Sequence, residues 1–125
     1  SSYFSLRRVW KAGDRVTLQC PMRLTVEPLP DDPSIQSFLY GPLVLAGDLG
    51  SAGLTDELVR NHQGPDVAKA PLAVPGLHAS GPGPESWLQP GPDPLSFRPG
   101  GSNPLLTLRP IHQLWGRFAI YWQVA

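Results

Sequence analysis

Proline and glycine set the tightest limit on what this chain can fold into. The chain has 16 prolines and 13 glycines among 125 residues, which is about twice the usual share of these two residues. Proline breaks helices and glycine weakens them, so the composition argues against a helical bundle. Hydrophobic residues make up 41% of the chain and aromatic residues 9%, which is too much for a disordered protein. We therefore expect a folded domain built from strands.

Charge and metal-binding residue types exclude several classes of protein. Ten basic residues balance ten acidic ones, so we expect no nucleic-acid partner and no anionic membrane partner. No apolar run approaches the roughly 20 residues that span a bilayer. The single cysteine, Cys20, cannot form an internal disulfide or a multi-thiolate site. The three histidines lack the spacing of a metal pair, so no metal or cofactor is expected; they are His62, His78 and His112.

Period-two alternation predicts strands at both ends of the chain. Residues 3–27 alternate apolar and polar side chains, which indicates a hairpin with a turn at Gly13-Asp14 and then a third strand. This alternation places Trp10 and Cys20 in the core. Residues 117–124 alternate as well and predict one strand, with Phe118 and Trp122 on its buried face.

Apolar runs and prolines predict the structure of the middle of the chain. Residues 38–47 are apolar on both faces and predict a central buried strand with a break at Gly41-Pro42. Thr55 is a suitable cap for a short helix reaching Arg60. Eleven of the 16 prolines lie in residues 64–110, which form either a flexible linker or short strands joined by proline-rich turns. The interspersed Trp and Phe residues favour strands.

Together these patterns predict an all-β domain. We expect a single antiparallel β-sandwich over residues 1–125, immunoglobulin-like or jelly-roll-like, with a proline- and glycine-rich loop region at 64–103. The chain begins without methionine and ends directly after its last strand pattern. We therefore expect a domain taken from a longer protein.

Candidate sites are few. No Gly-x-Ser-x-Gly elbow, Walker loop or dinucleotide fingerprint is present, so no catalytic residue is predicted. Asp31-Asp32 with Glu27 suggests either calcium ligation or turn chemistry, and the proline-rich context favours the turn. Trp10 and Trp122 are expected in the core. Trp87 and Trp115 lie in loop-like sequence and are the candidates for ligand contact, because exposed aromatic planes stack on sugars.

Three segments together resemble a known family. Residues 6–16 fit an R-x-W-x-x-G-D-x-V pattern and are followed by Cys20-Pro21-Met22. Residues 40–47 read Tyr-Gly-Pro-Leu-Val-Leu-Ala-Gly, and residues 110–122 run from Pro-Ile-His to Tyr-Trp. In this order they resemble segments downstream of the catalytic barrel in bacterial proteins of glycoside hydrolase family 127, the β-L-arabinofuranosidase-like group. The proline-rich middle is outside this resemblance.

The resemblance implies an accessory role. In that family the zinc-bound cysteine nucleophile and its glutamate belong to an upstream (α/α)₆ barrel that this chain lacks, and Cys20 does not match the nucleophile's context. The matching residues are structural: Trp10 and Trp122 as core, Gly13-Asp14 as turn, Gly41-Pro42 as strand break. We therefore expect a non-catalytic domain that packs on the barrel of a glycoside hydrolase and helps to shape its substrate entrance or a dimer contact. A carbohydrate-binding module and a protein-interaction domain outside glycan metabolism remain the alternatives.

Overall fold

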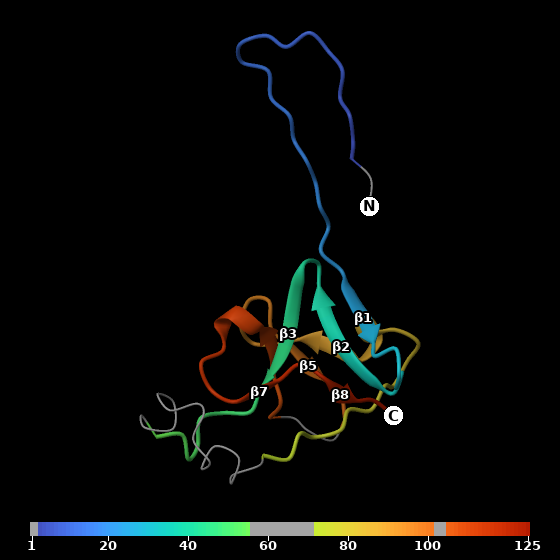
Figure 1. Cartoon of the computed structure of the whole chain (residues 1–125). Coiled ribbons are helices and arrows are strands. Elements are labelled where there is room, and N and C mark those ends of the chain that lie inside the picture. Colours follow the sequence, from blue (N-terminus) through green and yellow to red (C-terminus); the bar gives the residue numbers. More distant parts are fainter. Residues whose placement is uncertain (1–2, 56–71, 102–104) are drawn as a thin grey trace.

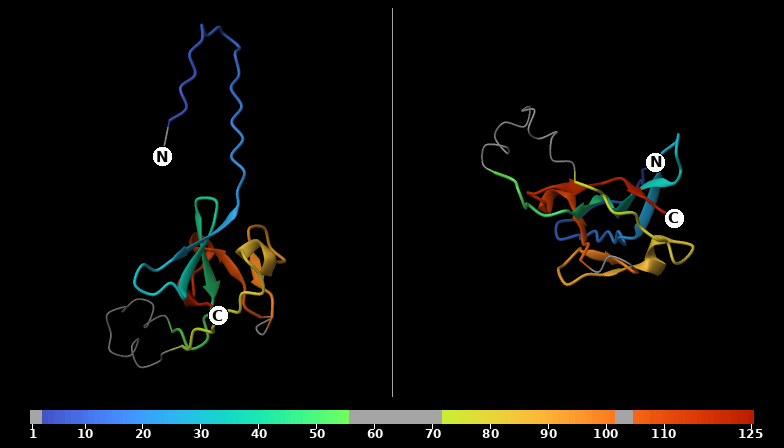
Figure 2. Two further views of the ribbon diagram at one scale, coloured as in Figure 1. Left: turned by 90° about the vertical axis from the view of Figure 1, so that its right-hand side faces the viewer. Right: turned by 90° about the horizontal axis from the view of Figure 1, so that it is seen from below.

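The computed structural model describes residues 3–55, 72–101 and 105–125. Within these ranges the protein is nearly all β, as predicted. Eight antiparallel strands form one sheet in the order β1-β2-β3-β6-β5-β4, with β7 paired to β3 and β8 to β2. The sheet curls into a half-barrel rather than forming two distinct layers of a sandwich (Figure 1, Figure 2). The strands are β1 Leu24–Pro28, β2 Ile35–Tyr40, β3 Leu43–Asp48, β4 Leu88–Pro90, β5 Phe97–Pro99, β6 Leu108–Pro110, β7 Phe118–Ala119 and β8 Trp122–Gln123.

Two short helical turns complete the described part of the chain. They are α2, Pro84–Trp87, and the 3₁₀ turn η1, Ile111–Gln113. Neither comes near the length that a membrane-crossing helix needs, and no other described helix does.

The hairpin β2–β3 lies at the centre of the sheet. Tyr40 pairs with Leu43, so Gly41-Pro42 is the two-residue turn between the strands. Gly41 has φ +56°, as a primed hairpin turn with glycine at its first central position requires. The single strand predicted over residues 38–47 is therefore wrong: Gly41-Pro42 reverses the chain and separates two antiparallel strands, β2 and β3, so the predicted break is there but as a hairpin turn.

The core lies where this hairpin meets the C-terminal strands. Trp122 and Phe38 are both fully buried, which confirms the prediction for Trp122. The Trp122 ring passes so close to Gly47 that a Cβ there would lie 2.2 Å from a ring carbon. Trp87 is also buried and meets the Phe38 ring edge-on, with centroids 5.4 Å apart. Glycine at position 47 thus makes room for the largest side chain of the core.

The proline-rich segment forms short strands, as the sequence favoured. Each of its three described strands has three residues and ends on a proline, at Pro90, Pro99 and Pro110. Proline has no amide donor, so it suits the end of a short strand. The predicted helix after Thr55 falls largely on residues 56–71, outside the described residues.

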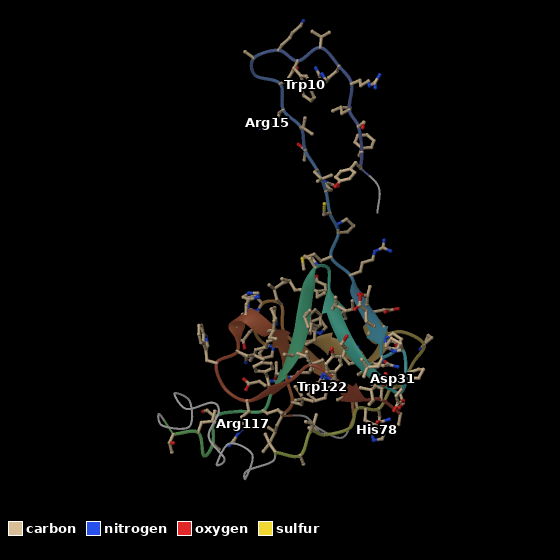
Figure 3. All side chains as sticks on the ribbon, viewed as in Figure 1. Trp10, Arg15, Asp31, His78, Arg117 and Trp122 are labelled. Atoms are coloured by element: carbon tan, nitrogen blue, oxygen red, sulfur yellow. The ribbon has the colours of Figure 1, made fainter. Side chains whose placement is uncertain are left out.

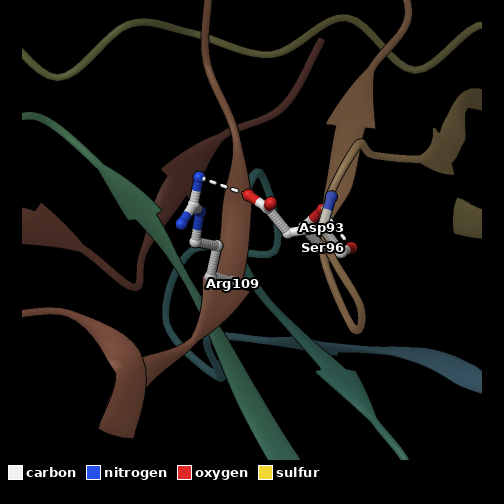
Figure 4. Close-up of polar contacts among 3 residues, drawn as sticks. All are labelled: Asp93, Ser96 and Arg109. Atoms are coloured by element: carbon white, nitrogen blue, oxygen red, sulfur yellow. Dashed lines mark hydrogen bonds and ion pairs between the residues drawn. The ribbon is translucent and has the colours of Figure 1, made fainter.

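The loop between β4 and β5 is held by a buried serine. The Ser96 hydroxyl donates to the Asp93 carbonyl at 2.7 Å and accepts from the Asp93 amide at 3.1 Å. The Asp93 carboxylate in turn pairs with Arg109 of β6 at 2.8 Å (Figure 4). These contacts fasten the proline-rich turn to the neighbouring strand.

The predicted C-terminal strand is not continuous. It is divided into β7, which pairs with β3, and β8, which pairs with β2. The chain crosses from one partner to the other at residues 120–121, so the pleat does not run through. Trp122 is accordingly buried, whereas Phe118 is 46% exposed. The prediction that Phe118 lies on the buried face is therefore wrong.

The largest departure from the sequence prediction is at the N-terminus. Strand structure begins only at Leu24, and the preceding residues project from the sheet as a long bent arm (Figure 1). We call residues 3–22 the arm. All side chains of residues 3–20 are exposed, including Cys20, and Trp10 is 50% exposed. The predicted first hairpin strands, and core positions for Trp10 and Cys20, are therefore wrong.

The arm still contains the predicted turn. The Asp14 amide donates to the Lys11 carbonyl at 3.1 Å, and the Asp14 carboxylate accepts from the Lys11 amide at 2.9 Å. Gly13 has φ +91°, a conformation that favours glycine. The turn at Gly13-Asp14 thus forms from local contacts alone, because the flanking segments have no strand partner among the described residues.

Candidate functional site

The structure separates the two tryptophans that were expected to contact a ligand. Trp87 is 3% exposed, because it lies at the end of α2 against Phe38, so its ring is not available for stacking. Trp115 is 94% exposed. Among the sequence candidates, Trp115 is therefore the one that lies at the surface.

A rigid backbone presents Trp115. The Leu114 amide donates to the Ile111 carbonyl at 3.1 Å and closes the η1 turn just before the tryptophan. Gly116, just after it, lies against Gly50, where an added Cβ would come within 2.8 Å of the Gly50 carbonyl oxygen. Residues that flank the tryptophan on both sides are thus fixed by backbone contact.

Arg117 extends this attachment. Its amide donates to the Gly50 carbonyl at 2.9 Å, and its carbonyl accepts from the Leu49 amide at 2.9 Å. Its guanidinium also donates to the Ala52 carbonyl. Arg117 therefore ties the Trp115 segment to the chain that leaves β3 (Figure 3).

A shallow cleft lies beside Trp115. Its volume is about 340 Å³, and we call it the Trp115 cleft; it is lined by Asp48, Gly50, Ser51, Gln113, Leu114, Trp115 and Gly116. The lining combines an aromatic ring with a carboxylate, a hydroxyl and an amide. The Asp48 carboxylate accepts from the Gly50 amide at 2.9 Å, which orients it. These groups offer stacking and several hydrogen bonds to a neutral, hydroxyl-rich ligand.

The same lining is suited to binding rather than to hydrolysis. Glycoside cleavage requires two carboxyl groups that face each other across the bond. Asp48 is the sole carboxylate among the described residues that line the cleft. The Trp115 cleft therefore lacks the pair of groups that this chemistry needs.

A larger hollow, of about 640 Å³, lies where the arm joins the sheet. It is lined by Met22, Arg23, Leu24, Thr25, Tyr40 and Glu85. Sequence reasoning did not find it, because Glu85 comes from α2 and the other residues from β1, β2 and the arm. No local motif connects these segments. The hollow brings one basic and one acidic side chain to the free edge of the sheet.

The remaining sequence candidates are scattered. Asp32 accepts hydrogen bonds from the Ser34 amide at 3.0 Å and the Ser34 hydroxyl at 2.5 Å, so turn chemistry is confirmed there. His78 and His112 are both exposed, and His62 lies outside the described residues. In the described parts of the chain, no three metal-ligating side chains come together.

A scan against protein-family models gives no match, and a search of curated protein sequences gives no significant match.

Proposed function

We propose that this chain is a non-catalytic accessory domain of a glycoside hydrolase. The domain packs on an upstream (α/α)₆ barrel through the exposed residues around Trp115. The observation that carries the proposal is the 94% exposure of Trp115 on a fixed backbone. The resemblance of three ordered segments to proteins of glycoside hydrolase family 127 supplies the identity of the neighbouring domain.

The surroundings of Trp115 are suited to packing against another protein. Phe118 is 46% exposed, Tyr121 51% and Ile111 37%. Together with Trp115, these exposed residues of the segment 111–121 are called the Trp115 surface. Aromatic residues of this kind are enriched in interfaces and often contribute most of the binding energy. Because the backbone is already fixed, binding would order little of it, which lowers the entropic cost of association.

The test compares the two exposed tryptophans. The chain is titrated into the purified barrel of the parent polypeptide, and affinity is measured by calorimetry. Trp115→Ala is expected to weaken binding about tenfold or more, as truncation of an interface hot spot does. Trp10→Ala makes the same change on the arm and is expected to leave the affinity unchanged. Equal effects of the two substitutions, or no binding by the unmodified chain, would refute the proposal.

Activity provides a second readout. The chain alone is expected not to hydrolyse aryl-arabinoside substrates, whereas the barrel should be more active with the chain than without it. Measurable turnover by the chain alone would overturn the accessory role.

The Trp115 cleft supports a second candidate function, a carbohydrate-binding module. Asp48, Ser51 and Gln113 surround the ring with hydrogen-bonding groups. Titration with arabinose-containing oligosaccharides, followed by tryptophan fluorescence, distinguishes the two functions. A saturable change that Trp115→Ala abolishes would favour sugar binding. No change at millimolar sugar, together with binding to the barrel, would favour domain packing.

A further inference from the structure

The chain is neutral overall, but its charge is divided unevenly. The arm and the residue that follows it, residues 3–23, contain five basic residues and one acidic residue, a net charge of +4. Because the whole chain has a net charge of zero, the remainder carries −4. Two copies therefore have no net repulsion, while the arm of each is complementary in charge to the body of the other.

The arm exposes both apolar and basic side chains. Phe4 is 91% exposed, Trp10 50% and Leu18 83%. Arg7 and Arg15 add positive charge on either side of the Gly13-Asp14 turn. The arm thus offers apolar contact and positive charge to a partner.

Arg8 differs from Arg7 and Arg15 because its side chain is bound within the arm. Its guanidinium pairs with the Asp14 carboxylate at 3.0 Å and lies over the Trp10 ring, 5.0 Å from its centroid. It is therefore used inside the arm to hold the turn. Arg7 and Arg15, in contrast, make no ion pair within the described ranges.

The complementary surface lies along β1. Within the described sheet, β1 is a terminal strand with β2 as its one strand neighbour, so no described strand pairs with its outer backbone edge. Glu27 lies on this strand, Asp31 and Asp32 follow it, and Glu85 of α2 lines the hollow beside it. We call this surface the acidic edge.

The arm is directed away from the acidic edge of its own sheet. Its base is fixed at the β2–β3 turn, because the Gly41 amide donates to the Arg23 carbonyl at 2.9 Å and Met22 packs on Gly41. From there the arm runs outward, and Trp10 and Arg15 lie at the opposite end of the molecule from Asp31 (Figure 3). In this position the far end of the arm points away from the acidic edge of its own sheet, whereas the edge of another copy is accessible to it.

We propose that the arm of one copy binds along the acidic edge of a second copy, and that the exchange is reciprocal. Arg7 and Arg15 of the arm then face Glu27 and Asp31, and apolar side chains of the arm are removed from water. An extended segment that adds to a free strand edge gains main-chain hydrogen bonds as well. This proposal does not use the Trp115 surface and does not depend on the accessory role proposed above.

Charge exchange between two variants tests the proposal on the full chain. One variant carries Arg7→Glu and Arg15→Glu in the arm. The other carries Glu27→Lys and Asp31→Lys at the edge, and leaves Asp32 in place because it holds the β1–β2 turn. Arg98→Glu, on exposed β5 sequence, is the control. Near-ultraviolet circular dichroism verifies that each variant retains its packed core.

Sedimentation velocity gives the readout. We expect the unmodified chain and the control to form dimers that dissociate as salt rises from about 0.02 to about 0.5 M, because screening weakens charge pairing. Each double variant alone should raise the dimer Kd about tenfold or more, because like charges then meet at both contacts. An equal mixture of the two should dimerise like the unmodified chain, since both contacts are complementary again.

Three results would overturn the proposal. The first is an unmodified chain that stays fully monomeric at about 100 μM and low salt, a concentration at which even weak dimers with Kd near 10 μM are populated. Dimerisation that does not respond to salt or to charge reversal would place the contact elsewhere. Failure of the mixed variants to associate, with both correctly folded, would exclude pairing of the arm with the acidic edge.

Discussion

The arm and the β2–β3 hairpin are both built around a glycine turn, yet they differ in what they bury. In the hairpin, Gly41 turns the chain so that β2 and β3 pair. Phe38 of β2 and Leu45 of β3 are fully buried. In the arm, Gly13 turns the chain in a similar way, but all side chains from residue 3 to residue 20 stay exposed. The turn is therefore a local property, whereas the strand is not.

The difference lies in the surfaces that each segment meets. β3 pairs with β2, β6 and β7, and the Trp122 ring covers Gly47. A segment becomes a stable strand when a neighbour supplies main-chain bonds and when its apolar face is removed from water. The arm has the alternating pattern but neither kind of neighbour in the described chain. Its apolar side chains are thus available for a partner.

Two tryptophans provide the strongest test of this comparison. Trp122→Ala removes a fully buried ring and is expected to lower the free energy of unfolding by about 3–5 kcal/mol. Trp10→Ala removes a half-exposed ring and is expected to change it by no more than about 0.5 kcal/mol. Urea unfolding, at a protein concentration low enough to keep the chain monomeric, measures both. A large loss from Trp10→Ala would mean that the arm packs on the sheet in solution.

Substitutions of two glycines, one in the core and one in the arm, test the same comparison with a smaller expected change in stability. A Cβ at Gly47 would overlap the Trp122 ring, so Gly47→Ala is expected to destabilise the fold by about 1–3 kcal/mol or more. A Cβ at Gly13 would meet nothing within 4 Å, and alanine there would suffer mainly from φ +91°, a strain of about 1–2 kcal/mol. Because the arm is not part of the core, that strain should loosen the turn and leave global unfolding by heat unchanged. Similar melting temperatures for the two variants would contradict this.

Sequence reasoning succeeded where local chemistry decides the structure. The glycine turns at residues 13 and 41 follow from backbone freedom, and the Asp32 turn follows from side-chain hydrogen bonding. The prolines that end β4, β5 and β6 follow from the missing amide donor. The β class of the described chain follows from these same effects, because proline and glycine disfavour helices.

Sequence reasoning failed where the burial of a side chain depends on a residue far away in the sequence. Trp10 and Trp122 both occupy apolar positions of an alternating segment, but only Trp122 meets Gly47 and the core. Trp87 was placed in a loop, because nothing nearby in sequence reveals its contact with Phe38, 49 residues away. The Trp115 cleft escaped prediction for the same reason, since Asp48 at the end of β3 and Ser51 just after it lie far from Trp115 in the sequence. Only Trp115 itself carried a signal, an aromatic residue in loop-like sequence.

The smallest expected change in stability comes from comparing two turns that are held by polar side chains. Ser96 is buried and exchanges two hydrogen bonds with Asp93, so Ser96→Ala is expected to lower the unfolding free energy by about 1 kcal/mol. Asp14 holds the arm turn through the Lys11 amide, but that turn is exposed. Asp14→Ala should therefore leave global stability unchanged and speed hydrogen exchange only within the arm turn, at the amides of residues 11 and 14. If Asp14→Ala instead lowers the melting temperature as much as Ser96→Ala does, the arm and the sheet unfold together. The arm and the sheet would then not be two independent units. The arm would stabilise the core of its own chain directly, without a second copy.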